Sequence, residues 1–351
     1  MRRERNQYIF ASELTKRNRS HRFRTAVLIL LPILIVSLWV LNITVSRRVQ
    51  LEEIKLTVLN LPDDLENFSI LHLSDLHGAR YGENQKAVET ALGTTKYSCV
   101  VMTGDMLGED GDVQPLLELI ALMPHDTPKF LIPGDTDGPA VESQAHSSLS
   151  VYTAWAEELQ AVGVQILDRP VLITREKGRI WFVPEELYAL DLEGMRSAVR
   201  NQLEELNSRK TSLTADDAAR IRALEYEAER VDALIEMEEE FLPTDIQVVL
   251  THTPLSAEYV SDMVSWAGKE DLFSMRYASL ILAGHYNGGQ WRIPGLLNGF
   301  YAPNQGFFPP LAGGKYERDG TVMIVSRGLA RESTRIPRFY NPPELVMIDL
   351  K

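Results

Sequence analysis

The sequence predicts a mixed α/β sandwich, in which two β-sheets pack face to face and helices cover their outer surfaces. Two observations support this fold class. Short runs of Val, Ile and Leu recur along the chain, each bounded by Gly, Pro or polar residues, as is typical of strands buried on both faces. Stretches with helical periodicity separate several of these runs.

The expected elements follow in chain order. Residues 50–60 alternate well enough for a first strand, and Pro62 begins the turn after it. Five apolar runs are then interpreted as strands: 68–73, 97–102, 129–132, 246–250 and 280–282. Helices are expected at 85–92, 113–123 and 150–162, and late strands at 321–326 and 344–350.

The segment 188–240 has a different pattern from the rest. Two amphipathic runs with helical spacing predict a helical hairpin that turns between Asn207 and Thr214. Thr214 and Asp217 resemble a capping box at the start of the second helix. Three interpretations remain open. The hairpin packs on itself or on the body, binds a protein partner, or covers the active site as a lid.

The N-terminal segment predicts a membrane anchor. Residues 25–46 contain no charged side chain and are long enough to span a bilayer core of about 30 Å. Eight Lys or Arg residues precede this run, whereas only Arg47 and Arg48 follow closely. This bias predicts a cytoplasmic basic tail over 1–24 and a body, 50–351, outside the cell membrane. A cleaved signal peptide is the alternative, but no small-residue cleavage pattern follows the run.

The net charge and the cysteine content limit which partners and which covalent links are expected for this chain. The net charge is −13; residues 1–48 carry ten Lys or Arg against two acids (+8), so the remainder carries −21. An acidic body repels a phosphate polyanion, so nucleic acid is not the expected partner. The single cysteine, Cys99, excludes an internal disulfide and is expected to be a buried structural thiol.

Possible metal ligands follow each of the five apolar runs. Because the carboxyl ends of strands in open α/β folds gather at one edge, these side chains are expected to converge. They are Asp75, His77, Asp105, Asp135, His252 and His285. Mixed carboxylate and imidazole ligands suit Mn, Fe or Zn better than Mg. The pattern therefore predicts a two-metal centre that activates water for attack at phosphorus.

Other polar residues have simpler explanations. Asp110 and Asp137 are interpreted as turn formers or satisfied polar residues, and His72, within a strand, as a core histidine. Arg327 and Arg331 could contact phosphate or form structural ion pairs. Aromatic residues of the late Gly/Pro-rich loop could pack on the sheet, line a groove or touch lipid. These are Tyr286, Phe300, Tyr301, Phe307 and Phe308.

The ordered motifs resemble the calcineurin-like metallophosphoesterase superfamily, whose pattern is D-x-H, G-D, G-N-H-[D/E], a lone His and G-H-x-H. The Leu-Ser-Asp-Leu-His at 73–77 and the Gly-His-Tyr-Asn-Gly-Gly-Gln at 284–290 are similar to its membrane-anchored bacterial, YkuE-like branch. The resemblance implies a four-layer α-β-β-α sandwich. It also implies that Asp75 and His77 hold one ion, that Asp105 bridges, and that Asp135, His252 and His285 hold the other.

Three positions depart from the family pattern. Asp135 replaces an asparagine ligand, Thr136 replaces the histidine that assists the leaving group, and Asn287 replaces the last histidine on the first ion. Asn287 offers only a neutral amide oxygen, so the first ion is expected to bind weakly. Thr136 cannot donate a proton near neutral pH, and such assistance is worth roughly 10²–10⁴-fold.

Two functions follow from these residues. One is a membrane-anchored phosphohydrolase with two divalent ions, acting on a phosphorylated small molecule or a lipid-linked substrate. The other is an attenuated relative that binds metal or ligand and uses the 188–240 hairpin as a partner surface.

Overall fold

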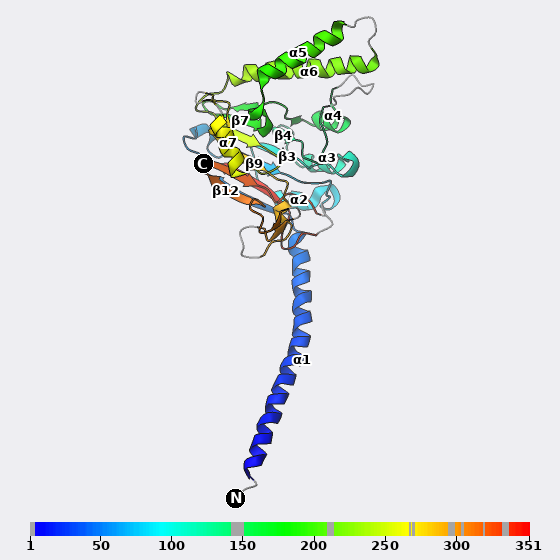
Figure 1. The fold of residues 1–351 in the computed structure, drawn as a ribbon, viewed down its shortest axis with the longest axis vertical. Coiled ribbons are helices and arrows are strands. Elements are labelled where there is room, and N and C mark those ends of the chain that lie inside the picture. Colours follow the sequence, from blue (N-terminus) through cyan, green and yellow to red (C-terminus); the bar gives the residue numbers. More distant parts are fainter. Residues whose placement is uncertain are drawn as a thin grey trace. The chain divides into compact units, whose positions relative to one another are not determined.

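The computed structural model describes residues 4–141, 151–208, 214–266, 268, 271–293, 299–302, 305–318, 320–331 and 337–351. The chain forms two compact units, Met1–Arg47 and Arg48–Lys351 (Figure 1). The first unit is dominated by helix α1 (Glu4–Ser46). Within it, Phe23–Ser46 is long and apolar enough to cross a membrane.

The second unit contains two six-stranded sheets. The first has the order β1-β14-β2-β3-β4-β5, in which β2 to β5 run parallel and β14 is antiparallel to β2. The bounds are β1 Gln50–Leu56, β14 Glu344–Leu350, β2 Ser69–Leu73, β3 Cys99–Thr103, β4 Lys129–Ile132 and β5 Val164–Ile166. The strands β2, β3 and β4 are buried almost throughout, as their continuous apolar sequences predict.

The second sheet has the order β12-β13-β9-β8-β7-β6, with a parallel centre and an antiparallel strand at each edge. Its bounds are β12 Gly314–Arg318, β13 Thr321–Val325, β9 Ala278–Ala283, β8 Ile246–Leu250, β7 Arg179–Pro184 and β6 Val171–Thr174. A short hairpin, β10 (Tyr301–Ala302) and β11 (Gly306–Phe307), stands apart from both sheets.

Three apolar clusters make the sandwich four layers deep. Between the sheets, Phe130 of β4 and Phe182 of β7 lie with ring centroids 4.9 Å apart. Outside the first sheet, a cluster joins its strands to α2 (Lys86–Leu92), α3 (Gln114–Ile120) and α4 (Ala154–Ala161). Outside the second sheet, another cluster includes partly buried residues of α7 (Ala257–Trp266). The predicted α/β sandwich is therefore confirmed.

The segment between β7 and β8 contains two long helices, α5 (Leu192–Ser208) and α6 (Ala215–Glu238), which pack against each other. Thr214 and Asp217 form the capping box at the start of α6. Arg196 of α5 donates to Asp232 of α6 at 2.8 Å. Apolar residues of both helices, such as Val199 and Val231, are buried. Part of the apolar stripe is therefore buried, and the role of the hairpin stays a prediction.

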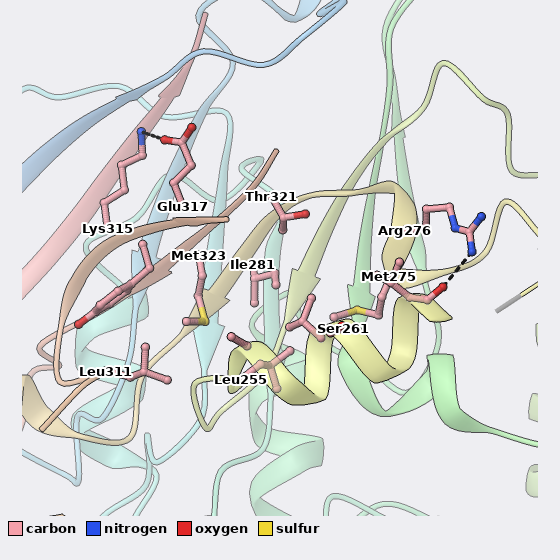
Figure 2. Close-up of a pocket in the computed structure, with 14 residues that line it drawn as sticks. Leu255, Ser261, Met275, Arg276, Ile281, Leu311, Lys315, Glu317, Thr321 and Met323 are labelled. Carbon is pink, nitrogen blue, oxygen red and sulfur yellow. Dashed lines mark hydrogen bonds and ion pairs between the residues drawn. The ribbon is translucent and has the colours of Figure 1, made fainter. Parts of the chain in front are cut away.

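A cavity of about 640 Å³ lies between α7 and the outer face of the second sheet (Figure 2). Its walls are mainly apolar and include Val264, Ile281 and Met323. Lys315 and Glu317, paired at 3.4 Å, also line it. The residues predicted as metal ligands are not among the described residues that line this cavity, so it is separate from the site considered next.

Candidate metal centre

Each predicted ligand directly follows the carboxyl end of a strand. Asp75 and His77 follow β2, Asp105 follows β3, and Asp135 follows β4 of the first sheet. The second sheet contributes His252 after β8 and His285 after β9. Side chains from both sheets thus meet at one edge of the sandwich.

The backbone of these loops is unusual for residues other than glycine. Left-handed φ angles between 45° and 72° occur at five positions, namely Asp75, His77, Asp105, His285 and Asn287. Such conformations cost free energy and persist only where the surrounding structure enforces them. Their concentration at one edge of the sandwich is typical of a functional site.

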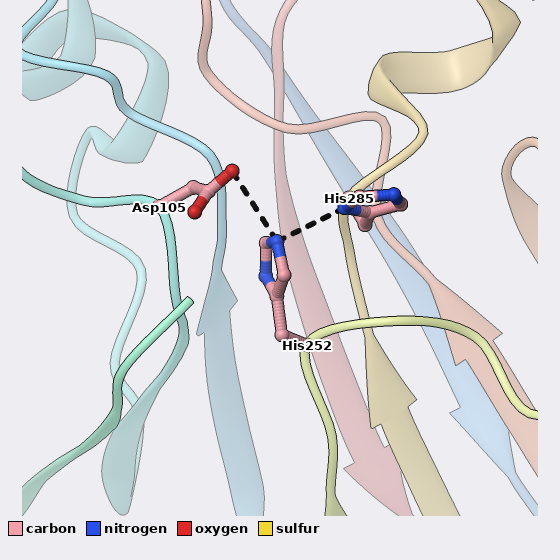
Figure 3. A group of neighbouring side chains, drawn as sticks. All are labelled: Asp105, His252 and His285. Atoms are coloured by element: carbon pink, nitrogen blue, oxygen red, sulfur yellow. Dashed lines mark hydrogen bonds and ion pairs between the residues drawn. The ribbon is translucent and has the colours of Figure 1, made fainter. Parts of the chain in front are cut away.

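The first group of possible ligands is Asp105, His252 and His285, whose ligand atoms lie within 4.8 Å of one another (Figure 3). His252 Nε2 is 3.3 Å from Asp105 Oδ2 and 3.2 Å from His285 Nδ1. The other ring nitrogen, His252 Nδ1, donates to the Thr103 carbonyl at 2.7 Å. This directs Nε2 toward the carboxylate and the second imidazole, and the deprotonated ring can bind a cation there.

The second group is Asp75, His77 and Asp105, again within 4.8 Å. His77 Nε2 is 3.5 Å from Asp105 Oδ2. Both oxygens of Asp75 accept from the His285 backbone N–H at 3.0 Å, which ties the two sheets together at the site.

Asp105 belongs to both groups. Its Oδ1 accepts from the Thr136 N–H at 2.8 Å, and its Oδ2 contacts both His77 and His252. A carboxylate oxygen common to two ligand groups is what a bridged pair of ions requires. The donor set therefore fits the metal ions that the sequence predicts.

The ionisation of these groups is coupled. Burial opposes ionisation of Asp105, but its hydrogen bond to His252 and the charge of that ring hold the Asp105 pKa below its usual range. Burial also disfavours protonated His252, but Asp105 and Asp75 outweigh it and raise the His252 pKa to about 9. Burial raises the pKa of Asp75. In the absence of metal, the proton on His252 compensates the buried carboxylates.

Asp135 occupies a more peripheral position than the other predicted ligands. Its Oδ2 lies 3.3 Å from His285 Nδ1, but 65% of its side chain is exposed. Among the described residues, it is not a member of either compact group. Asp135 therefore borders the His285 side of the centre.

Asn287 is buried and already has a strong partner. Its Oδ1 accepts a hydrogen bond of 3.0 Å from Arg338 Nη2, which also donates to the carbonyls of Arg327 and Gly328. Gly328, with φ +66°, packs so tightly that an added Cβ would lie 2.7 Å from Asp75 Cβ. The amide oxygen of Asn287, one of the three positions that differ from the family pattern, therefore accepts a hydrogen bond from a guanidinium cation. The sequence did not predict this contact.

Asp137, interpreted from the sequence as a turn former or a satisfied polar residue, is a satisfied polar residue that also joins two loops. It is buried, and its Oδ1 accepts from the N–H groups of Met106 and Leu107 at 2.8 Å. Its Oδ2 accepts from the Gly134 N–H at 2.9 Å. One carboxylate therefore fixes the loop after β3 to the loop after β4, and so positions Asp105. The only feature of the sequence that pointed to this role was the position of Asp137, two residues after the predicted ligand Asp135.

Arg327 and His72 have structural partners. Arg327 forms an ion pair with Glu344, so its structural interpretation is correct. His72 Nε2 lies 2.8 Å from Thr103 Oγ1 in the core, as expected for a core histidine. Arg331 donates to the Arg80 carbonyl at 2.9 Å and lies over the Tyr81 ring.

The chain is similar to known proteins in part of its sequence and in its structure. No curated protein matches the chain in sequence. A phosphopantetheinyl hydrolase from Mycobacterium tuberculosis is similar in structure, with 16% identity, a TM-score of 0.38, and coverage of 80% of this chain and 95% of that one. A protein assigned as a 5′-nucleotidase from Staphylococcus aureus has 10% identity and a TM-score of 0.37, and covers 80% of this chain and 54% of that one. The model of the calcineurin-like phosphoesterase family matches residues 68–287, and the chain therefore belongs to that family.

Proposed function

We propose that this protein is a membrane-anchored, metal-dependent phosphohydrolase of the YkuE-like branch, with two divalent ions at its centre. The observation that carries the proposal is the Asp105 carboxylate, whose Oδ2 lies between His77 at 3.5 Å and His252 at 3.3 Å. Two ligand groups that share one oxygen favour a pair of ions over a single one.

When bound, Mn, Fe, Zn or Mg ions would supply an activated water and neutralise charge on a phosphoryl group. The chain's own residues hold this arrangement in place. Thr103 fixes the ring of His252 through its carbonyl, so that Nε2 faces the centre. His285 fixes Asp75 through its backbone N–H, and Thr136 fixes Asp105 in the same way. Backbone groups thus hold His252, Asp75 and Asp105 in position.

The proposed substrate is a phosphoester or phosphoanhydride of a small or lipid-linked molecule. The acidic body supports this, because it repels nucleic acid. The 188–240 hairpin is proposed as a surface for a protein partner, since much of its outward face is charged and exposed.

Activity and metal content test the centre together. The full chain in detergent would be stripped of metal and reloaded with Mn, Zn, Fe or Mg. Hydrolysis of p-nitrophenyl phosphate and bis-p-nitrophenyl phosphate is then measured. Asp105→Ala and His252→Ala should abolish both metal retention and turnover, whereas His125→Ala, at an exposed histidine, should change neither. If the protein is folded but hydrolyses neither substrate with any of these metals, the proposed phosphohydrolase activity is refuted.

We further propose that residues 1–24 form a cytoplasmic tail, that 25–46 span the cell membrane, and that the 50–351 body lies outside. The single cysteine, Cys99, is buried, which gives a low background for thiol labelling. In intact cells, an impermeant maleimide should label Lys96→Cys and spare Ser12→Cys. The reverse labelling pattern would refute this orientation.

A second candidate function is a metal- or ligand-binding relative with attenuated catalysis. Thr136 and the Asn287–Arg338 hydrogen bond favour it, because both remove chemistry that the family pattern provides. Thr136→His discriminates between the two candidates. A gain of tenfold or more on a poor leaving group indicates an attenuated enzyme, whereas a loss indicates a native site tuned to another substrate.

A further inference from the structure

The late loops carry an exposed aromatic surface that the proposed reaction does not use. Phe307 and Phe308 are 64% and 66% exposed, and Trp291 and Phe339 are also exposed. Their rings form a continuous series with Phe300 and Tyr301, in which successive centroids lie 5.3 to 6.2 Å apart. We call these six residues the aromatic surface.

The aromatic surface is held by backbone contacts. Trp291 forms bridges to Tyr301 and to Phe339. The Phe308 N–H donates to the Phe300 carbonyl at 2.9 Å, and Phe308 itself has a left-handed φ of 58°. A left-handed phenylalanine with an exposed ring has two unfavourable features. The exposed ring is understandable if it meets an apolar partner.

Chain connectivity indicates which partner this is. Only Arg47, Arg48 and Val49 separate the last residue of α1 from Gln50, the first residue of β1. Gln50 donates to the Pro343 carbonyl at 2.9 Å, and Pro343 is four residues from Phe339. Four residues span at most about 14 Å. Phe339, at one end of the aromatic surface, therefore lies near Gln50, where the body begins.

We propose that the aromatic surface inserts into the interface of the lipid bilayer and holds the metal centre close to the membrane. This inference rests on the proposed membrane anchor. Tryptophan, tyrosine and phenylalanine suit the boundary between headgroups and acyl chains. Arg47 and Arg48 are exposed beside the junction and can contact lipid phosphates. Trp291 follows Asn287 by four residues, so docking would bring the centre within reach of a substrate embedded in the bilayer.

Tryptophan quenching tests the proposal in the full chain. The protein is reconstituted in phosphatidylcholine nanodiscs with and without brominated acyl chains, which quench nearby indoles. Trp39 lies in the apolar helix and reports the anchor, so Trp39→Phe removes its signal. In that background, Trp291→Phe should remove most of the remaining quenching. Trp266→Phe is the matched control, because Trp266 is 68% exposed on α7 and outside the aromatic surface.

The outcomes separate docking from anchoring. Replacing Phe307 and Phe308 together by serine should lower the quenching of Trp291 at least twofold, and both positions are exposed enough to tolerate the change. Quenching of Trp39 without quenching of Trp291 would overturn the docking and leave the anchor standing. If Trp266→Phe, rather than Trp291→Phe, removes the remaining quenching, docking of the aromatic surface would also be overturned. No quenching of either Trp39 or Trp291 would overturn the anchor itself.

Discussion

Removing the charge of Arg338 should strengthen the binding of the first metal ion, which Asp75, His77 and Asn287 are expected to hold. Arg338 Nη2 is 3.0 Å from Asn287 Oδ1, and a metal–oxygen bond adds about 2.2 Å. An ion on that oxygen would therefore lie about 5 Å from the guanidinium. At an effective dielectric constant of about 20, a unit charge and a divalent ion at this separation repel by about 6 kcal/mol. Neighbouring carboxylates offset much of this, but about 1.4 kcal/mol is enough for a tenfold change in affinity.

The test uses two variants that differ in charge. Arg338→Gln removes the cation and should tighten the weaker Mn²⁺ site at least tenfold, whereas Arg338→Lys retains the cation and should leave it weak. Calorimetric titration of the metal-free protein gives both dissociation constants, and electron paramagnetic resonance detects a coupled ion pair. Asn287→His alone should gain little, because the guanidinium remains. Equal affinities of the weaker site in the wild type and in Arg338→Gln would refute the reasoning.

Three further predictions concern other buried groups. Asp137→Ala removes three hydrogen bonds to a carboxylate and should lower the free energy of unfolding by roughly 3 kcal/mol or more, with loss of metal affinity. Denaturant unfolding checks this, and Asp126→Ala, at an exposed carboxylate, should have no effect. Burial lowers the pKa of His72 to about 3, below the value of about 6.5 in the unfolded chain. The neutral ring therefore contributes its full stability above about pH 6.5, and this contribution is lost as the pH falls toward 3. His72→Gln should therefore remove about 2 kcal/mol of the destabilisation seen between pH 7 and pH 5; an unchanged acid dependence would contradict this. In the absence of metal the pKa of His252 is raised to about 9, so metal binding at pH 7.5 should release about one proton. In calorimetry, the measured heat of metal binding should then depend on the ionisation enthalpy of the buffer. Binding heats independent of the buffer would count against a protonated His252.

The sequence was sufficient to predict the strands that position the centre. β2, β3 and β8 consist of continuous apolar residues and are buried on both faces, so their ends are marked by the first polar residues that follow. Asp75, Asp105 and His252 stand at those ends, and the structure brings them together.

Elements at the edges of the sheets were harder to predict. β12, with the sequence Gly-Lys-Tyr-Glu-Arg, lacks an apolar run, because it is an edge strand with exposed residues. β6 and β7 also went unpredicted, although Trp181 and Phe182 of β7 are fully buried. The pairing of β6 and β7 depends on neighbours far along the chain, which local periodicity does not reveal.

The partners of the ligands were beyond sequence reasoning for a different reason. Arg338 is 51 residues from Asn287, and no local pattern relates them. The exposure of Asp135 depends on how the loop after β4 turns, which in turn depends on the contacts of Asp137 with the loop after β3. Such contacts are decided by tertiary packing and leave little trace in local sequence.

One short segment connects the metal centre to the aromatic surface. Arg338 is buried and donates to Asn287, whereas the next residue, Phe339, is exposed and contacts Trp291. Asn341 is also buried, and its Nδ2 donates to the Asn287 carbonyl at 2.6 Å. Consecutive residues of this segment therefore contact Asn287, the position where this chain departs from its family, and the aromatic surface.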